Sequence, residues 1–219
     1  METHVSDPDW LQWHERYEIS PDRQARLRLV RSHIADCLAS LPPGPINVIS
    51  VCAGDGRDLC GVLSTHERAG DVTARLVEIN PELAARGTQA IEAARLGKRM
   101  SYLVADASQF DTYVSMAPAD LVVAAGIFGN LRPAEMARLI DGLPCLCRPG
   151  AFVVWTRHRT SNDGRQALPD TREMFARAGF DGVVEDVTSE TGYAIGTHRY
   201  RGAGQALPAD QRWFRFGVG

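Results

Sequence analysis

The sequence lacks the features that would point to a membrane, a secretion signal or a nucleic acid. No run of about 18 apolar residues occurs, so no segment is expected to span a bilayer. The first residues carry neither a basic start nor an apolar stretch, so no signal peptide is expected. The net charge of -3 leaves no basic excess of the kind that binds a polyanion. We therefore expect neither a membrane nor a nucleic acid as a partner.

Cysteine is scarce and follows no metal-binding pattern. One residue separates Cys145 from Cys147, whereas a zinc knuckle has two, and no second pair follows. The odd number of cysteines also argues against a disulfide framework. We expect no metal site, and we interpret all five as reduced thiols of a cytoplasmic protein. They are Cys37, Cys52, Cys60, Cys145 and Cys147.

What is present is the composition of an ordinary globular domain. The chain has 219 residues, 44% of them hydrophobic and 23% charged, which is enough to bury one core. Ser20 and Pro21 indicate a helix start with serine as the N-cap, and an apolar helical face follows as far as Leu41. The proline-rich segment 42–45 ends this helix. We expect residues 1–45 to form an N-terminal helical cap segment and residues 46–219 to form the main domain.

Short apolar segments then alternate with helical patterns. The predicted strands are 46–51, 74–79, 101–104, 121–125 and 151–156, and the predicted helices are 57–66, 80–96, 133–143 and 170–178. Such alternation is typical of a parallel sheet covered on both faces.

The end of the chain follows a different pattern. The predicted strands 183–187 and 193–200 have no helix between them, so we expect an antiparallel hairpin. The predicted fold is α/β, with a Rossmann-like, doubly wound, mostly parallel seven-stranded sheet that ends in this hairpin. Trp213, Phe214 and Phe216 predict that the tail packs back on the body.

Glycine and acidic residues follow the first two predicted strands. Gly54 and Gly56 let the backbone turn tightly and let a ligand approach where a side chain would collide. The helix that begins after them points free N–H groups toward that ligand. Glu78 ends the second strand, where a carboxylate can accept hydrogen bonds from both hydroxyls of a ribose.

The next two predicted strands end in a similar way. Asp106 lies just past the third strand, and the segment 126–130 (GIFGN) lies just past the fourth. Because the carboxyl ends of parallel strands share one edge of a sheet, we expect a ligand crevice there. For Asp106 the alternative role is to cap a following turn.

This constellation resembles the class I S-adenosylmethionine (SAM)-dependent methyltransferases over residues 46–200. Their antiparallel seventh strand also matches the predicted hairpin. Residues 52–58 and 155–159 are in addition similar to those of a group of small actinobacterial proteins assigned to this family. The resemblance implies SAM as the cofactor. It places Gly54 and Gly56, with Ala53 and Asp55, at the methionine part, Glu78 on the ribose, Ile79 on the adenine face, Asp106 and Ala107 at the adenine edge, and Gly126 and Phe128 along the wall.

The sequence departs from the family pattern at two positions. Ser50 stands where the family usually has an acidic residue, and Cys52 replaces the first glycine of the motif. These two changes leave open which residue holds the ammonium group of SAM.

Two further segments contain candidate site residues. His158 follows the fifth predicted strand, and it is the candidate general base because an imidazole titrates near neutral pH. Its neighbours Arg157 and Arg159 are candidates for binding a substrate carboxylate, with simple exposure as the alternative. In this family the N-terminal segment often covers the cofactor, so the resemblance places Tyr17 near the SAM carboxylate. The alternative is that aromatic residues there anchor a terminal helix.

The resemblance implies in-line methyl transfer from SAM. The small N-terminal addition and the lack of a basic face favour a small-molecule acceptor, an oxygen or nitrogen nucleophile of small-molecule metabolism, over RNA or DNA. Two alternatives stay open: a non-catalytic SAM-binding regulatory or partner protein, and an NAD(P)-dependent oxidoreductase. Against the oxidoreductase, Leu59 stands where the third glycine of the dinucleotide fingerprint would fall. The sequence predicts neither the acceptor nor the oligomeric state.

Overall fold

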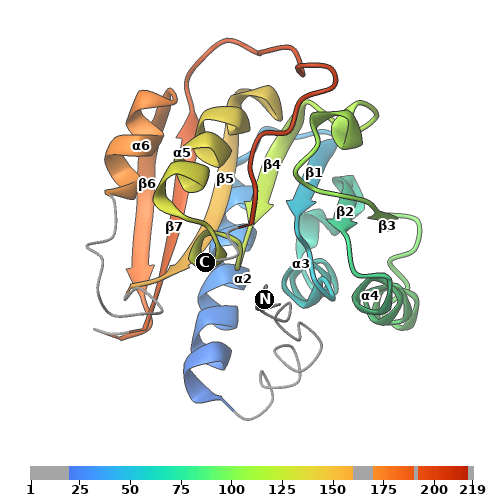
Figure 1. Ribbon diagram of the computed structural model, residues 1–219. Helices are drawn as coiled ribbons and strands as arrows, with labels where there is room; N and C mark the ends of the chain where they lie inside the picture. Colours follow the sequence, from blue (N-terminus) through green and yellow to red (C-terminus); the bar gives the residue numbers. More distant parts are fainter. Residues whose placement is uncertain (1–19, 160–169, 190–191, 217–219) are drawn as a thin grey trace, which may run out of the picture.

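The computed structural model describes residues 20–159, 170–189 and 192–216. Seven strands form one sheet in the order β3-β2-β1-β4-β5-β7-β6 (Figure 1). β7 pairs antiparallel with both β5 and β6, and the pairs from β3 across to β5 are parallel. The predicted mostly parallel sheet and its C-terminal hairpin are therefore confirmed. The strands are β1 (Ile46–Val51), β2 (Val72–Glu78), β3 (Met100–Val104), β4 (Ala119–Ala124), β5 (Cys147–His158), β6 (Phe180–Val187) and β7 (Tyr193–Tyr200).

Helix starts follow the predicted capping residues. The Ser20 side chain accepts a hydrogen bond from the N–H of Arg23, and Asn80 accepts from the N–H groups of Glu82 and Leu83. A proline occupies the first turn after each of these caps. The helices are α2 (Pro21–Ser40), α3 (Arg57–Leu63), α4 (Pro81–Ala93), α5 (Pro133–Gly142) and α6 (Thr171–Arg177), with short 3-10 turns η1 (Glu67–Asp71), η2 (Phe110–Tyr113), η3 (Phe128–Asn130) and η4 (Leu143–Cys145).

Two helices, α3 and α4, end about three residues earlier than predicted. The pattern predicts a helix over 57–66, whereas α3 ends at Leu63. The reason is a second cap: His66 Nδ1 accepts a hydrogen bond from the Arg68 N–H and starts η1. A side-chain acceptor at this position competes with continuation of the helix.

The two faces of the sheet bury separate apolar clusters. Val30 of α2 and Leu59 of α3 pack with Val48 and Leu76 on one face. Residues of α5, α6 and the C-terminal tail pack on the other face with partners such as Val153. Figure 1 shows α5, α6 and the tail in front of the sheet. Within the described ranges, no helix is long and apolar enough to cross a bilayer.

The tail after β7 packs back on the body, as predicted. Trp213 and Phe214 are buried in the cluster on the α5 face, whereas Phe216 is exposed. The described part of the tail, up to residue 216, runs across this face (Figure 1).

Candidate functional site

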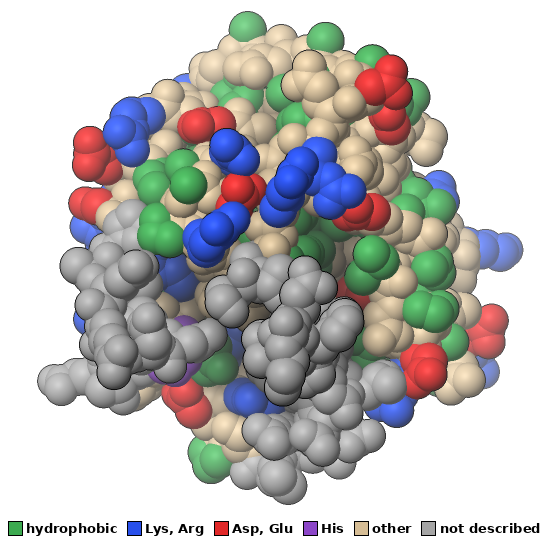
Figure 2. Space-filling model, viewed as in Figure 1, with side chains coloured by type: hydrophobic (Ala, Val, Ile, Leu, Met, Phe, Trp, Pro, Cys, Tyr) green, Lys and Arg blue, Asp and Glu red, His purple; other side chains and the backbone are tan. Residues whose placement is uncertain are grey.

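The carboxyl ends of four strands meet at one edge and bring the predicted site residues together. The strand register aligns Val51 with Val77, and Glu78 with Val104. Ser50 lies opposite Val123 of β4. The segments that follow β1, β2, β3 and β4 therefore start side by side. The space-filling view is hollowed near its centre, and Lys and Arg side chains gather above the hollow (Figure 2).

The turn after β1 has an unusual backbone. Three of its residues have a positive φ: Cys52 at 52°, Gly54 at 57° and Gly56 at 65°. Glycine adopts this conformation readily, whereas a residue with a Cβ is strained by about 1–2 kcal/mol. Cys52 is thus a cysteine in a backbone conformation that favours glycine. The turn stays closed because the Ala53 N–H donates to Val77 O over 2.9 Å.

Glu78 fastens this turn to the end of β2. Glu78 is 7% exposed, so its charge needs local partners. Oε2 accepts a hydrogen bond of 2.8 Å from the Gly54 N–H, and Oε1 accepts one of 2.8 Å from the Asn80 N–H. One side chain therefore orders both the glycine turn and the start of α4.

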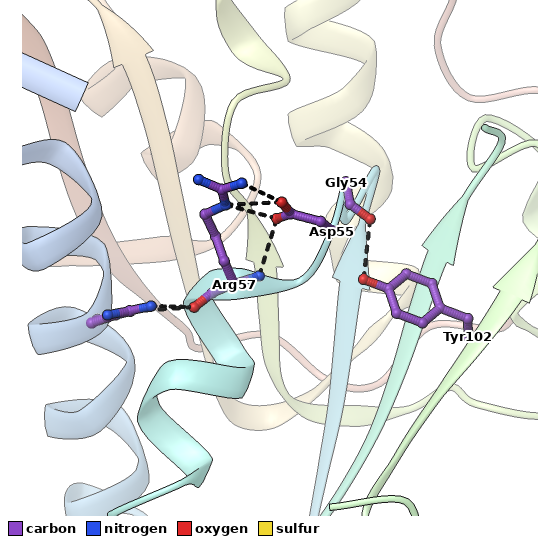
Figure 3. A network of polar contacts seen from close by, with 5 residues as sticks. Gly54, Asp55, Arg57 and Tyr102 are labelled. Carbon is purple, nitrogen blue, oxygen red and sulfur yellow. Dashed lines mark hydrogen bonds and ion pairs between the residues drawn. The ribbon is translucent and has the colours of Figure 1, made fainter. Parts of the chain in front are cut away.

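Asp55 and Arg57 form an ion pair within the same turn (Figure 3). Arg57 Nε donates to both carboxylate oxygens of Asp55 at 2.9 Å. Beside it, the Tyr102 hydroxyl donates to Gly54 O over 3.1 Å. Arg31 of α2 donates to Arg57 O over 2.6 Å. Asp55 thus directs its carboxylate to Arg57 and contributes to the site by holding the turn.

Two apolar side chains are left uncovered beside Glu78. Ile79 is 64% exposed, and Val104 at the end of β3 is 54% exposed. Exposed large apolar side chains next to a buried carboxylate suit the flat face of a ring.

Asp106 caps a turn after β3, which is the alternative that its position allowed. Its Oδ1 accepts hydrogen bonds from the Ser108 N–H at 2.9 Å and from Ser108 Oγ at 2.7 Å. Its Oδ2 lies 3.1 Å from Arg212 Nη2. Partial burial acts to raise the pKa of Asp106, but the Ser108 hydrogen bonds and the Arg212 charge outweigh it and lower that pKa. Asp106 is therefore an ionised acceptor near neutral pH.

Arg26 places a buried cation at the ends of β4 and β5. It is 4% exposed, and its Nε and Nη2 donate to Thr156 Oγ1 at 3.2 and 2.9 Å. The Gly126 N–H donates to the same oxygen over 2.8 Å. A Cβ added at Gly126 would lie 3.0 Å from Arg26 Nη2, so glycine permits this close approach. Burial raises the pKa of Asp58, opposed by the Leu59 N–H and the Arg26 charge.

The structure places Phe128 in the core instead of along the crevice. Its ring is 2% exposed and stacks on Trp155 at 5.5 Å and on Phe175 at 6.2 Å. The expectation that Phe128 walls the ligand is therefore corrected for its ring, which packs behind the site. An aromatic residue after a strand is equally suited to core stacking, and here that contact prevails.

His158 lies apart from the glycine turn. It ends β5, meets Tyr193 edge to face at 4.9 Å, and lines a shallow pocket with Asp22, Arg28 and the turn before β7. Neither Glu78 nor Asp106 lines that pocket. Arg157 points to the other face, where Nη1 lies 3.8 Å from Met136 Sδ. Tyr17 falls outside the described residues.

The site contains residues that the sequence patterns did not single out. Arg26 interrupts the buried side of α2, which is formed with Val30, Ile34 and Cys37. A single arginine on an otherwise apolar helix face could have identified Arg26 as a site residue, because a buried cation needs a specific partner. No such signal identified Thr156 or Tyr102. Within the described residues, no group of three or more His, Cys, Asp or Glu side chains could hold a metal ion.

No family model matches the sequence, and no curated protein matches it. Solved structures share the fold. Magnesium protoporphyrin IX methyltransferase (ChlM) from Synechocystis PCC 6803 with bound S-adenosylhomocysteine (SAH) has a TM-score of 0.68 at 15% identity, covering 87% of this chain and 94% of that one. The 1,6-didemethyltoxoflavin-N1-methyltransferase of Burkholderia thailandensis, with both its substrate and S-adenosylhomocysteine bound, has a TM-score of 0.60 at 17% identity, covering 92% and 94%. The [4+2]-cyclase SpnF has a TM-score of 0.58 at 15% identity, covering 82% and 83%. At these identities the likeness establishes the fold.

Proposed function

We propose that this protein is a SAM-dependent methyltransferase that acts on a small-molecule acceptor. The observation that carries the proposal is the pair of hydrogen bonds that the Glu78 carboxylate accepts from the Gly54 and Asn80 N–H groups. They fix a carboxylate between a glycine turn and an exposed Ile79. The turn, the carboxylate and the apolar side chain suit the methionine, ribose and adenine parts of SAM in that order.

Each residue has a role in this proposal. Each oxygen of Glu78 uses one lone-pair direction for a backbone N–H, which leaves one direction on each for a ribose hydroxyl. Ile79 covers one face of the adenine, Asp106 accepts from its amino group, and Ala107 lies beside it. Gly54, Gly56 and Gly126 keep the backbone free of side chains near the methionine part.

Arg26 is the proposed binding partner of the SAM carboxylate. Its guanidinium lies beside Gly126, at the edge where β4 and β5 end, and a cation there stabilises a carboxylate by a charge-assisted hydrogen bond. The test compares SAH with adenosine, which lacks the methionine part. Arg26→Met should weaken SAH binding at least about tenfold and leave adenosine binding unchanged. An equal loss for both ligands would refute this role.

Methyl transfer itself needs little from the protein beyond alignment. The acceptor atom attacks the methyl carbon, and the carbon–sulfur bond breaks with its electron pair staying on sulfur. The acceptor then loses its proton to a base or to water. The main contribution of the protein is to hold the acceptor about 3 Å from the methyl group. His158 remains a candidate base, because it lies at the end of β5 beside a shallow pocket.

The net charge of the chain and the fold neighbours support a small-molecule acceptor. The net charge of -3 favours a small molecule over a nucleic acid, and the fold neighbours named above include enzymes of porphyrin and toxoflavin compounds. We propose an oxygen or nitrogen nucleophile as the acceptor.

The five free cysteines support a cytoplasmic location. Thiol titration of the purified protein after unfolding in denaturant, without a reductant, should detect five thiols.

A second candidate function is SAM binding without methyl transfer. The observation that favours it is the altered glycine motif, where Ser50 is buried and Cys52 has a positive φ. The [4+2]-cyclase SpnF has the same fold, so the fold does not determine the reaction. For an NAD(P)-dependent oxidoreductase no comparable observation exists within the described residues.

Calorimetric titration with SAM, SAH and NADH tests the proposal. We expect micromolar binding of SAM and SAH, loss of binding in Glu78→Ala, and no change in Glu92→Ala, whose side chain is exposed on α4. Binding of NADH alone would refute the methyltransferase. Binding of SAM without methylation across an acceptor library would favour the second candidate.

A further inference from the structure

The C-terminal tail is hydrogen-bonded to the loop that follows β3. Gln109 and Arg212 form an antiparallel bridge. The Phe110 N–H donates to Gln211 O over 3.0 Å, and the Trp213 N–H donates to Ser108 O over 2.9 Å. This loop contains the two residues placed at the adenine edge, Asp106 and Ala107. The tail therefore acts as an additional short strand beside that subsite.

Trp213 anchors the tail from within the core. Its Nε1–H donates to Ala107 O over 2.8 Å, and its ring lies 5.2 Å from Phe110 and 5.9 Å from Tyr113. A buried indole needs such a partner for its N–H. The backbone of Ala107 is thereby held in one position, and the residue before Trp213 is aimed at the loop.

That residue, Arg212, faces Asp106. Its Nη2 lies 3.1 Å from Asp106 Oδ2, and both side chains are partly exposed. The Gln109 amide is oriented with its oxygen toward the guanidinium of Arg212. In this orientation the oxygen accepts hydrogen bonds from Arg212 Nη2 at 2.8 Å and from Nε at 3.2 Å. Gln109 thus steadies Arg212 while Arg212 steadies Asp106.

The two oxygens of Asp106 have different partners. Oδ1 already accepts two hydrogen bonds from Ser108. Oδ2 contacts Arg212, and the Gln109 side chain also lies against this carboxylate. The ion pair with Arg212 therefore helps to fix the orientation of the carboxylate. The hydrogen bonds from Ser108 lower the pKa of Asp106 most, and the Arg212 charge lowers it further, so Asp106 accepts and does not donate.

We propose that Arg212 is a positioning residue that sets the base specificity of the cofactor site. By orienting Asp106 as an acceptor, it selects the 6-amino group of adenine and disfavours a 6-oxo group, which presents a second acceptor and leaves the carboxylate unmatched. This inference rests on the proposed function, because it needs an adenine at Asp106. This residue lies in the tail after β7, far in sequence from the loop after β3 that carries Asp106.

The test measures discrimination between two ligands that differ at one position of the base. Dissociation constants for SAH and for S-inosylhomocysteine are determined by calorimetry for the native protein, Arg212→Gln and Arg201→Gln. Arg201 forms an exposed ion pair with Asp181 where the tail begins, so it is the matched control. Thermal unfolding reports whether each variant is folded.

We expect the native protein to prefer SAH by at least about tenfold, a typical penalty for an unmatched polar pair. Arg212→Gln should weaken SAH binding about tenfold and change S-inosylhomocysteine binding little, so that the preference collapses. Arg201→Gln should keep the native ratio. Native SAH binding with an unchanged ratio in Arg212→Gln would overturn the inference, and so would an equal loss for both ligands. Failure of the native protein to bind either ligand would overturn the proposed function itself.

Discussion

The Gly54 N–H donates to Glu78 Oε2 over 2.8 Å, so the glycine turn after β1 is tied directly to the last residue of β2. Because this carboxylate also holds the Asn80 N–H, it sets the relative position of the turn and the next helix. The same residue thus has a structural task and a proposed ligand-binding task.

Replacing Glu78 with glutamine removes the charge and one of the two acceptor oxygens, and so affects both tasks. The amide of Glu78→Gln has one acceptor oxygen, so one of the two backbone N–H groups loses its partner and faces the amide NH2. We expect a loss of about 1–3 kcal/mol in the free energy of unfolding and at least about tenfold weaker SAH binding. Urea unfolding and calorimetry measure the two effects. Glu92→Gln, on the exposed side of α4, should change neither.

Gly56 tolerates no side chain. Its φ is +65°, and an added Cβ would lie 2.6 Å from Leu76 Cδ2 and 2.6 Å from Tyr102 Oη. Gly56→Ala should therefore lower the free energy of unfolding by more than about 2 kcal/mol, from the positive φ and the two close contacts together. Gly97→Ala is the matched control, because nothing lies within 4 Å of its added Cβ. Equal stabilities of the two variants by urea unfolding would contradict the described turn.

Thr156 supplies one oxygen to three donors. Thr156→Val keeps the shape of the side chain but removes the acceptor of Arg26 and of the Gly126 N–H. We expect a loss of about 2–3 kcal/mol in the free energy of unfolding, because buried donors are left unsatisfied. Thr156→Ser keeps the oxygen and should retain most of the stability. A valine variant as stable as the native protein would contradict this network.

Cys52 should react slowly although it lies at the candidate site. Cys52 is partly buried, and this burial raises the pKa of its thiol well above the usual range, as do the charges of Glu78 and Asp106. Because the thiolate is the reactive form, alkylation of Cys52 by iodoacetamide at pH 8 should be at least about tenfold slower than in the urea-unfolded chain. Mass spectrometry of the peptide that contains Cys52 gives the alkylation rate. The Cys52→Ser variant, which lacks this thiol, identifies the alkylated peptide. Rapid labelling in the folded protein would refute this expectation.

His198 makes the stability depend on pH. Burial lowers its pKa from 6.5 to about 4, helped by the charge of Arg172, and its Nδ1 accepts from Trp155 Nε1. The unfolded chain takes up the proton first, so this stabilisation is complete above about pH 6.5 and is lost as pH falls toward 4. We expect the free energy of unfolding to fall by up to about 3 kcal/mol over this window. His198→Asn should flatten the curve there, and an unchanged slope would contradict the prediction.

The sequence predicted most of the sheet because its strands are short apolar segments with clear boundaries. β1 has the predicted bounds Ile46–Val51, and the caps Ser20 and Asn80 start their helices where expected. Gly54, Glu78 and Asp106 were placed at one edge by strand order alone. These features depend on local patterns and on the general geometry of parallel sheets.

The remaining features depend on contacts between distant residues. Arg26 meets Thr156 from the far end of the chain, and Arg212 meets Asp106 through a tail without periodicity. The Phe128 ring turned to Trp155 because the core offered a stacking partner that no local pattern reveals. Tyr17 and the catalytic role of His158 stay predictions.

The position of β7 has a consequence for biosynthesis. Among the strands that the structure describes, β6 pairs only with β7, and β5 completes its pairing when β7 inserts between them. A ribosome-bound chain that has released β1 to β6 therefore still has an open sheet edge at β5. The loop after β3 gains its partner later still, because the segment 211–213 is translated after β7. A nascent chain that has released only β1 to β6 therefore lacks both the strand that completes the sheet and the segment that holds the proposed adenine-side loop.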